Sequence, residues 1–219
     1  APYEIAHDPS YEEHINKYDV IGLDVQSFFL LDDDPQAFIK RLETAVLEEV
    51  CAKWSDIDGL KGMGLVNALI KVHETTGAKF VFVIDEWDAV FRYYPKDDEM
   101  QKKWIHFLRD MFKQAAMNPC VALVYMTGIL PIKKYKTQSS LNQFFEYTML
   151  RPLELEKYVG FLPAEVDALC EKFDMNRAEA AEWYDGYMLP HEHHVYNPCS
   201  VAQAMTYRAY GSYWTETDT

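Results

Sequence analysis

Three short and mostly apolar runs stand out along an otherwise mixed chain. They cover residues 19–25, 80–84 and 120–126 and are rich in Val, Ile, Leu and Phe. A largely continuous apolar run of this length is typical of a strand that is buried on both faces, as in a parallel sheet. We therefore expect these runs to form the core strands of a sheet.

The segments between these runs carry apolar residues at helical spacing. The predicted helices cover residues 35–50, 65–75 and 100–116. Asp34 is expected to cap the first helix, with Pro35 at its first position, and Gly77 is expected to close the second. Strands that alternate with helices indicate an α/β fold, in which helices cover the faces of a parallel sheet.

The pattern changes after about residue 150. The spacing there predicts three helices with no strand between them. These helices cover residues 160–173, 177–187 and 198–209. We therefore expect two domains, an α/β core over residues 1–150 and an all-helical lobe over residues 151–219.

Composition limits the functions that are open to this chain. Of its 219 residues, 49% are apolar, which is enough for a sizeable core, and the formal net charge is −14. An acidic surface repels phosphate backbones, so we expect no direct nucleic-acid binding by this segment. No apolar run approaches membrane-spanning length. The four cysteines lie far apart without CxxC spacing, which favours reduced thiols in a cytoplasmic protein.

Two adjacent carboxylates, Asp85 and Glu86, directly follow the second apolar run. Open α/β sheets bind ligands at the carboxyl ends of their strands, where these acids are expected. In P-loop ATPases an Asp at this point serves the Mg²⁺ of the bound nucleotide, and a Glu after it can polarise the attacking water. This arrangement is the Walker B pattern; the alternative is an acidic turn after a core strand. Asp88 is expected to cap the next helix or to support the acid pair.

Further residues are candidates for contacts with phosphate. Thr127 ends the third apolar run, where related ATPases place a sensor of the γ-phosphate or the attacking water; the alternative is a Thr that caps a turn. Arg109 is a candidate arginine finger, against the alternative of a salt bridge to Asp110. Lys133 and Lys134 follow the third run and are expected in a solvated loop, with contact to phosphate as the alternative.

Other patterns argue against particular sites. The cluster of His191, His193 and His194 lacks a second ligand group at fixed spacing, which favours a polar loop over zinc. The glycines of residues 59–64 follow no strand and lack a GK[ST] ending, so they do not form a phosphate loop. GxxxxGK[ST] occurs nowhere. The chain as written therefore lacks the loop whose amides and Lys hold the β- and γ-phosphates.

Beyond these motifs, a series of sequence blocks resembles the bacterial predicted AAA-ATPase-like family from about Tyr18 onward. The blocks are, in order, FVFVIDEWD, WIHFLRDMF, YMTGILPIKKYKTQSSLNQFFEYTM, EKYVGFLPAEVDALCEKF, EWYDGY, VYNPCSVAQAM and SYW. TGILPIKKY, WYDGY and YNP-x-S are more specific to the family than the acid pair. The resemblance implies a P-loop strand before Ala1 and a PD-(D/E)XK nuclease-like domain in cis beyond Thr219, so that this chain is a fragment.

The resemblance also implies roles for individual residues. Asp85 matches the acid that holds Mg²⁺ through water, Glu86 the catalytic acid, and Thr127 the sensor position, whereas the family's phosphate-loop Lys has no counterpart. The implied fold is a P-loop NTPase-like (ASCE/AAA-like) parallel sheet with flanking helices. In such a sheet the P-loop strand lies between the sensor strand and the last strand, and its absence leaves unpaired edges.

The chain is therefore expected to be an ATPase core that binds and hydrolyses ATP with Mg²⁺ only when the P-loop completes it. The alternative is a nucleotide-independent binding module with a degenerate site that recruits a protein partner. A nuclease is disfavoured for this segment, because no D…(D/E)xK set follows a strand.

Overall fold

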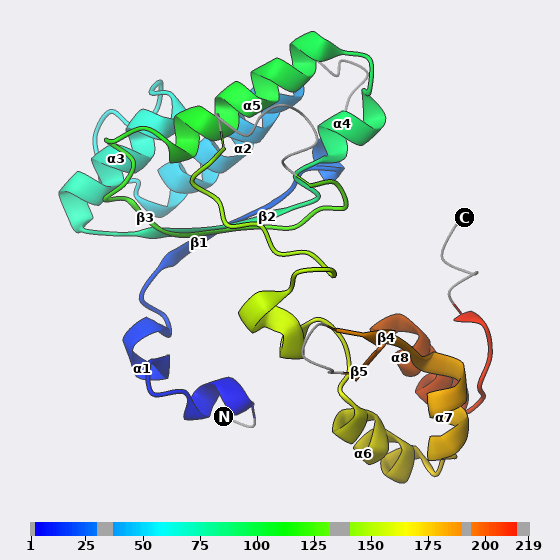
Figure 1. Ribbon diagram of the computed structural model, residues 1–219. Coiled ribbons are helices and arrows are strands. Elements are labelled where there is room, and N and C mark those ends of the chain that lie inside the picture. Colours follow the sequence, from blue (N-terminus) through cyan, green and yellow to red (C-terminus); the bar gives the residue numbers. More distant parts are fainter. Residues whose placement is uncertain (1–2, 30–36, 132–140, 190–193, 214–219) are drawn as a thin grey trace. The chain divides into compact units, whose positions relative to one another are not determined.

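The computed structural model describes residues 3–29, 37–131, 141–189 and 194–213. The chain divides into two compact units, Ala1–Phe144 and Phe145–Thr219, whereas the sequence-based division was placed after residue 150. Each unit has a hydrophobic core of its own. The first contains a three-stranded sheet and the second a two-stranded one (Figure 1).

The sheet of the first unit consists of the three strands that the apolar runs predict. They are β1 (Asp19–Asp24), β2 (Phe80–Asp85) and β3 (Val121–Met126). Their order is β1-β2-β3, and both neighbouring pairs are parallel. This arrangement confirms an α/β fold with a parallel sheet, consistent with a P-loop-like architecture.

Helices α2, α3 and α5 lie on one side of this sheet (Figure 1). The helices of the first unit are α1 (Tyr11–His14), α2 (Phe38–Lys53), α3 (Leu65–Thr76), α4 (Ala89–Tyr93) and α5 (Asp98–Phe112). Gly77 closes α3 in the left-handed conformation, as predicted. Asp34 and Pro35 lie outside the described residues.

One local prediction for the first unit is wrong. The predicted helix over residues 100–116 ends at Phe112, because the chain then enters turns in which the Met117 N–H donates to the Gln114 carbonyl over 3.0 Å. A short helix, α4, follows the acid pair and was not predicted from the sequence. That helix determines which side chains reach the acids.

The core of the first unit lies between the sheet and the helices. Phe80, Phe82 and Ile84 are buried, and they alternate along β2 with residues that face the other way. The Phe82 ring meets Phe112 of α5 edge-on, with the centroids 5.0 Å apart. Trp104 of α5 is fully buried as well. Burial of such large side chains fixes the strands and therefore the positions of their carboxyl ends.

The opposite face of the sheet, here called the open face, carries exposed apolar side chains. They are Val20 (66% exposed), Val83 (38%), Leu123 (56%) and Tyr125 (51%). Among the described residues β3 pairs only with β2, so it forms an edge of the sheet. Parallel sheets are normally covered on both faces. The open face is therefore unusual for a sheet of this kind.

The second unit is not all-helical, which corrects the prediction. It contains the helices α6 (Pro163–Phe173), α7 (Arg177–Tyr184) and α8 (Pro198–Tyr207), and the strands β4 (Asp185–Met188) and β5 (His194–Tyr196). The two strands pair antiparallel. They are short, and every residue of β4 is exposed, so no run of buried residues marks them in the sequence.

Among the residues that the structure describes, no helix combines the length and the apolar character needed to cross a membrane.

Candidate functional site

The carboxyl ends of β1, β2 and β3 meet at one edge of the sheet. Asp24, the last residue of β1, is in register with Asp85, the last residue of β2. Thr127 directly follows β3, and its hydroxyl donates a hydrogen bond to the Asp85 carboxylate. The same carboxylate oxygen accepts the Glu86 N–H over 3.1 Å. The fold thus brings together Asp85 and Thr127, two of the residues that the sequence singles out, and leaves Asp85 exposed to solvent.

Glu86 turns the chain sharply as it leaves β2. Its φ is +54°, in the left-handed region that non-glycine residues rarely occupy. Neighbouring hydrogen bonds hold this turn: Trp87 N–H donates to the Thr127 carbonyl over 3.0 Å and Ala89 N–H to the Glu86 carbonyl over 2.9 Å. A residue in this region costs about 1–3 kcal/mol and persists where its surroundings fix it, often at functional sites.

The Glu86 carboxylate forms an ion pair with Arg92 of α4. Arg92 also lies close to Asp88, whose Oδ2 is 3.3 Å from Arg92 Nε, an ion pair without hydrogen-bond geometry. Both the Glu86 and the Arg92 side chains are largely shielded from solvent. Arg92 therefore bridges the carboxylates of Glu86 and Asp88, which belong to the same turn of the chain.

Asp88 is the anchor of this arrangement. Its side chain is fully buried, and it does not cap α4 although it stands at the N-terminal end of that helix. Instead, Oδ2 accepts the Leu130 N–H over 2.9 Å, which ties α4 to the segment after Thr127. Oδ1 has no hydrogen-bond partner among the described residues. Asp88 thus supports the acid pair through Arg92, which agrees with the second of the two roles expected for it.

Sequence reasoning missed Arg92. Its separation of four residues from Asp88 is a usable signal, because residues at i and i+4 of a helix face one another. No such rule predicts the pair with Glu86, six residues away. That contact depends on the left-handed turn at Glu86.

The first unit matches a known protein family. The family model described as "Predicted AAA-ATPase" matches residues 3–137, more than half of the chain. The chain belongs to this predicted AAA-ATPase family. No curated protein matches it.

The match with the predicted AAA-ATPase family covers all three strands and the whole cluster at their carboxyl ends. Asp85, Glu86, Arg92, Arg109 and Thr127 lie inside the matched range. The second unit, which begins at Phe145, lies beyond it. The family match therefore applies to the sheet and to the residues at the carboxyl ends of its strands, and not to the second unit.

Arg109 is the candidate that the described contacts do not connect to the cluster. It lies in the last turn of α5, and its side chain forms an ion pair with Asp110, with Nη2 3.3 Å from Oδ1. This is the salt bridge that the sequence offered as the alternative. Its role as an arginine finger stays a prediction. Lys133 and Lys134 lie outside the described residues.

The side chains at the carboxyl ends of the strands offer oxygen atoms as metal ligands. Among the described residues no three His, Cys, Asp or Glu side chains gather closely enough to hold a metal ion by themselves. Of the histidine cluster, His194 pairs with Asp185, and His191 and His193 lie outside the described residues. Mg²⁺ keeps several waters and takes one or two carboxylates together with substrate phosphates. Exposed Asp85, beside the Thr127 hydroxyl, fits such a partial ligand set.

Cys120, the cysteine next to β3, is not an activated nucleophile. Cys51, Cys120, Cys170 and Cys199 are all free thiols. Burial raises the pKa of the Cys120 thiol, which precedes β3, and the nearby Glu74 raises it further. A raised pKa disfavours the thiolate, the reactive form.

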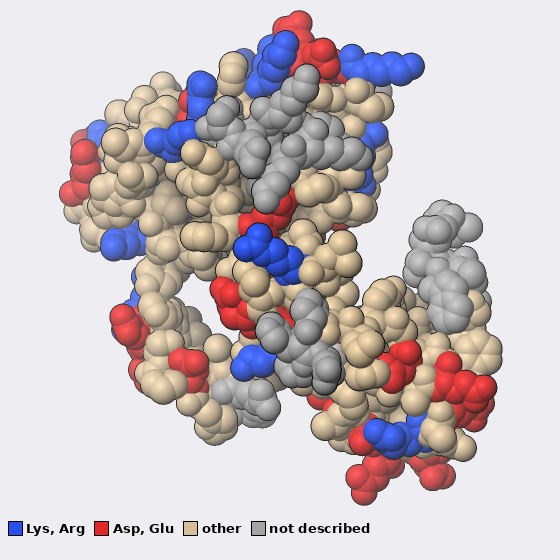
Figure 2. All heavy atoms as spheres, viewed as in Figure 1, with Lys and Arg blue, Asp and Glu red and all other residues tan. Residues whose placement is uncertain are grey.

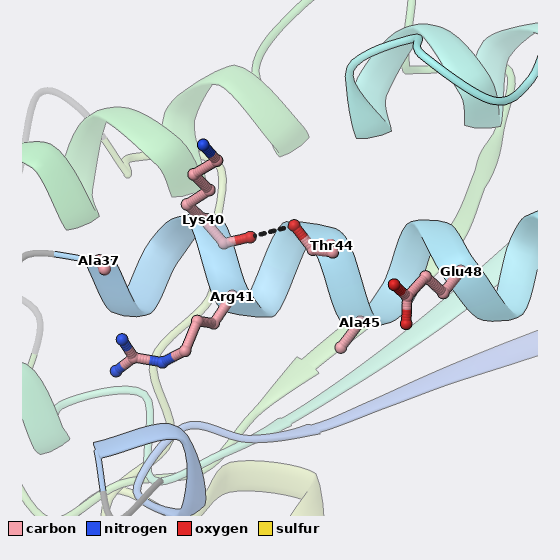
Figure 3. Close-up of a pocket in the computed structure, with 6 residues that line it drawn as sticks. All are labelled: Ala37, Lys40, Arg41, Thr44, Ala45 and Glu48. Atoms are coloured by element: carbon pink, nitrogen blue, oxygen red, sulfur yellow. Dashed lines mark hydrogen bonds between the residues drawn. The ribbon is translucent and has the colours of Figure 1, made fainter. Parts of the chain in front are cut away.

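A pocket of about 330 Å³ elsewhere on the first unit is not this site. It runs along one face of α2 and is lined by Ala37, Lys40, Arg41, Thr44, Ala45 and Glu48 (Figure 3). The Thr44 hydroxyl within it donates to the Lys40 carbonyl, a bond internal to the helix. None of its lining residues belongs to the cluster at the carboxyl ends of the strands.

Gly128 gives a direct test of the packing around the acids. A Cβ at this position would lie 2.6 Å from Asp88 Oδ1 and 2.6 Å from Trp87 Cδ1. Gly128→Ala is therefore expected to lower the free energy of unfolding by about 1–3 kcal/mol, the usual cost of overpacking. Urea denaturation measures it. Gly22→Ala is the matched control because a Cβ there meets nothing within 4 Å. Equal losses for the two variants would contradict the packing described here.

Proposed function

We propose that the carboxyl edge of this sheet is the magnesium-binding and water-activating half of an ATP hydrolysis site. Asp85 holds Mg²⁺ through water, Glu86 polarises the attacking water, and Thr127 senses the γ-phosphate or the water. The observation that carries this proposal is the hydrogen bond from the Thr127 hydroxyl to the Asp85 carboxylate, between the ends of neighbouring strands. Membership of the predicted AAA-ATPase family supports it.

The chemistry of the proposed site follows from the residue types present. Mg²⁺ bound with ATP supplies charge neutralisation at the phosphates. An exposed carboxylate such as Asp85 is the hard oxygen ligand that this ion prefers. The Glu86 carboxylate polarises the attacking water by accepting a hydrogen bond from it. General-base catalysis of this kind typically raises the rate 10²–10⁴-fold. The Thr127 hydroxyl can both donate and accept hydrogen bonds, so it can contact the γ-phosphate or the attacking water.

The phosphate-binding loop is proposed to come from residues outside these 219. The sequence contains no GxxxxGK[ST], and without that loop no backbone cradle holds the β- and γ-phosphates. The edge position of β3 supports the idea, because the family resemblance puts the P-loop strand beside the sensor strand. We propose that this chain alone does not hydrolyse ATP.

Nuclease chemistry, if the full-length protein has it, is proposed to belong to a PD-(D/E)XK-like domain outside this chain. The net charge of −14 opposes contact with nucleic acid. On the face shown in Figure 2, the Lys and Arg side chains of the described residues form small groups separated by acidic and neutral ones, and these residues form no continuous basic patch there. We propose that this segment makes no direct contact with nucleic acid.

Asp85→Asn tests the magnesium role. Asn keeps an oxygen that can accept the Thr127 hydroxyl proton, so the fold is expected to survive, but the charge that attracts Mg²⁺ is lost. In the full-length natural protein we expect the Mg²⁺ concentration for half-maximal phosphate release to rise about 10-fold or more, the scale of losses at metal sites. The measurement is phosphate release at saturating ATP over a range of Mg²⁺ concentrations.

Two comparisons complete this experiment. Asp56→Asn, an exposed acid in the loop after α2, is the control and is expected to leave the Mg²⁺ dependence unchanged. The isolated 219 residues are expected to release no phosphate above background. If they hydrolyse ATP at a rate that Glu86→Gln removes, the proposal that an outside loop is essential is wrong.

The second candidate function is a binding module that recruits a protein partner without nucleotide. The open face favours it, because Leu123 and Tyr125 expose more than half of their surface, and exposed apolar patches commonly mark interaction sites. Titration calorimetry of the full-length protein with Mg-ATP separates the two candidates. Heat of binding supports the ATPase, and its absence supports the binding module.

A further inference from the structure

The backbone turn at Glu86 does not by itself fix the orientation of the Glu86 side chain. A glutamate has three side-chain torsions, and ordering such a side chain costs up to about 2 kcal/mol of conformational entropy. The contact that orders it is the ion pair with Arg92. Arg92 is held in turn by Asp88, which is buried and fixed by the Leu130 N–H. A chain of contacts thus runs from the end of β3 to the Glu86 carboxylate.

We propose that Arg92 is a positioning residue that sets the location and orientation of the Glu86 carboxylate for catalysis. This inference rests on the proposed function, in which Glu86 polarises the attacking water. Arg92 does not touch the reacting groups in this account. It acts through Glu86 and uses Asp88 as its fixed point.

The geometry explains why an arginine occupies this position. One guanidinium reaches two carboxylates at once, with Nη2 at Glu86 and Nε facing Asp88. The planar guanidinium presents several N–H groups in a fixed arrangement, whereas a lysine offers one compact charge on a flexible stem. Lysine at this position is therefore expected to pair with one carboxylate but not to bridge both.

The kinetic test uses the full-length natural protein and Mg-ATP. Arg92→Met is expected to lower kcat about 10-fold while KM for Mg-ATP changes less than 2-fold, because binding of the phosphates does not involve Glu86. Arg92→Lys is expected to restore part of the lost kcat. Arg177→Met is the matched control: it removes a similar ion pair, with Asp167, in the second unit, and it is expected to leave kcat unchanged.

A second readout does not need catalysis. In the protein without nucleotide, thermal unfolding is measured for Arg92→Met, Glu86→Ala and the double variant, because Ala, unlike Gln, cannot accept a hydrogen bond from Arg92. Because the two side chains contact one another, the loss in Tm of the double variant is expected to be smaller than the sum of the single losses. In the kinetic assay, Arg92→Met is likewise expected to lower kcat less than 2-fold further when Glu86→Gln is already present.

The outcomes separate this inference from the function on which it rests. Wild-type protein without ATP hydrolysis would overturn both. An active wild type, with Glu86→Gln inactive and both Arg92 variants at or above the wild-type kcat, would overturn the positioning role alone. Additive losses of Tm would overturn the Arg92–Glu86 pair whatever the activity, and an equal kcat loss in both Glu86 backgrounds would show that Arg92 acts independently of Glu86.

Discussion

Glu86→Gln is expected to lower kcat for ATP hydrolysis by the full-length protein about 10²–10⁴-fold, the usual contribution of a general base. Gln matches Glu in size, and its side-chain oxygen can still accept a hydrogen bond from Arg92. The change therefore removes the charge that is proposed to polarise water but leaves the turn after β2 in place. Affinity for Mg-ATP is expected to stay within about 3-fold of wild type, because Asp85 and not Glu86 is proposed to serve the metal.

Single-turnover phosphate release gives the rate, and titration calorimetry with Mg-ATP gives the affinity. Glu99→Gln is the matched control, because Glu99 pairs with Lys103 on the exposed surface of α5. Its rate is expected to equal that of wild type. A Glu86→Gln variant that keeps more than half of the wild-type rate would remove Glu86 from the proposed mechanism.

Trp104→Ala is expected to lower the free energy of unfolding of the first unit by about 3–5 kcal/mol, the range for a large aromatic side chain in a core. Trp104 is fully buried and packs against the rings of Phe38 and Phe107, each with its centroid 5.4 Å away. Its indole N–H also donates to the Trp87 carbonyl over 2.9 Å. Truncation removes apolar contacts, leaves a cavity and leaves that buried carbonyl without its donor.

Hydrogen exchange of the β2 amides under native conditions measures this loss for the first unit specifically. Trp183→Ala, a change at a partly exposed tryptophan of the second unit, is expected to leave β2 exchange unaltered. Trp104→Phe separates the two contributions: it keeps most of the packing and is expected to cost about 1–3 kcal/mol for the unpaired carbonyl. A loss below about 1 kcal/mol for Trp104→Ala would contradict the packing of α5 against the sheet.

These two predictions meet at one segment of the chain. The Trp87 carbonyl accepts from Trp104, and the Trp87 N–H donates to the Thr127 carbonyl over 3.0 Å. The residue that follows the acid pair is thus tied to both α5 and the end of β3. Removal of the Trp104 contacts is therefore expected to increase the mobility of Asp85 and Glu86 as well as to destabilise the fold.

Most of the first unit could be predicted from sequence, because its signals are local. Each core strand is a short and mostly apolar run, and the helices between them carry apolar residues at helical spacing. The placement of Asp85 and Thr127 at one edge follows from parallel strands alone, since parallel strands end at the same side of a sheet. No long-range information is needed for these inferences.

The second unit shows where such reasoning fails. β4 has no buried residue and β5 only three residues, so neither produces the alternation or the apolar run that indicates a strand. Their pairing depends on the chain reversing after Met188. The helices on either side were predicted, because these carry the apolar residues of the small core. The helix predicted over residues 177–187 nevertheless ends at Tyr184, since β4 begins at Asp185.

The sequence by itself determined the α/β class, the three parallel strands and the presence of an acid pair at a strand end. The tertiary structure alone decided what surrounds those acids. The left-handed turn at Glu86 brings Arg92 to its carboxylate, and burial of Asp88 beside Gly128 fixes Arg92 in turn. Periodicity reflects which residues a chain buries, whereas ion pairs across a turn depend on backbone angles and on neighbours that are distant in sequence.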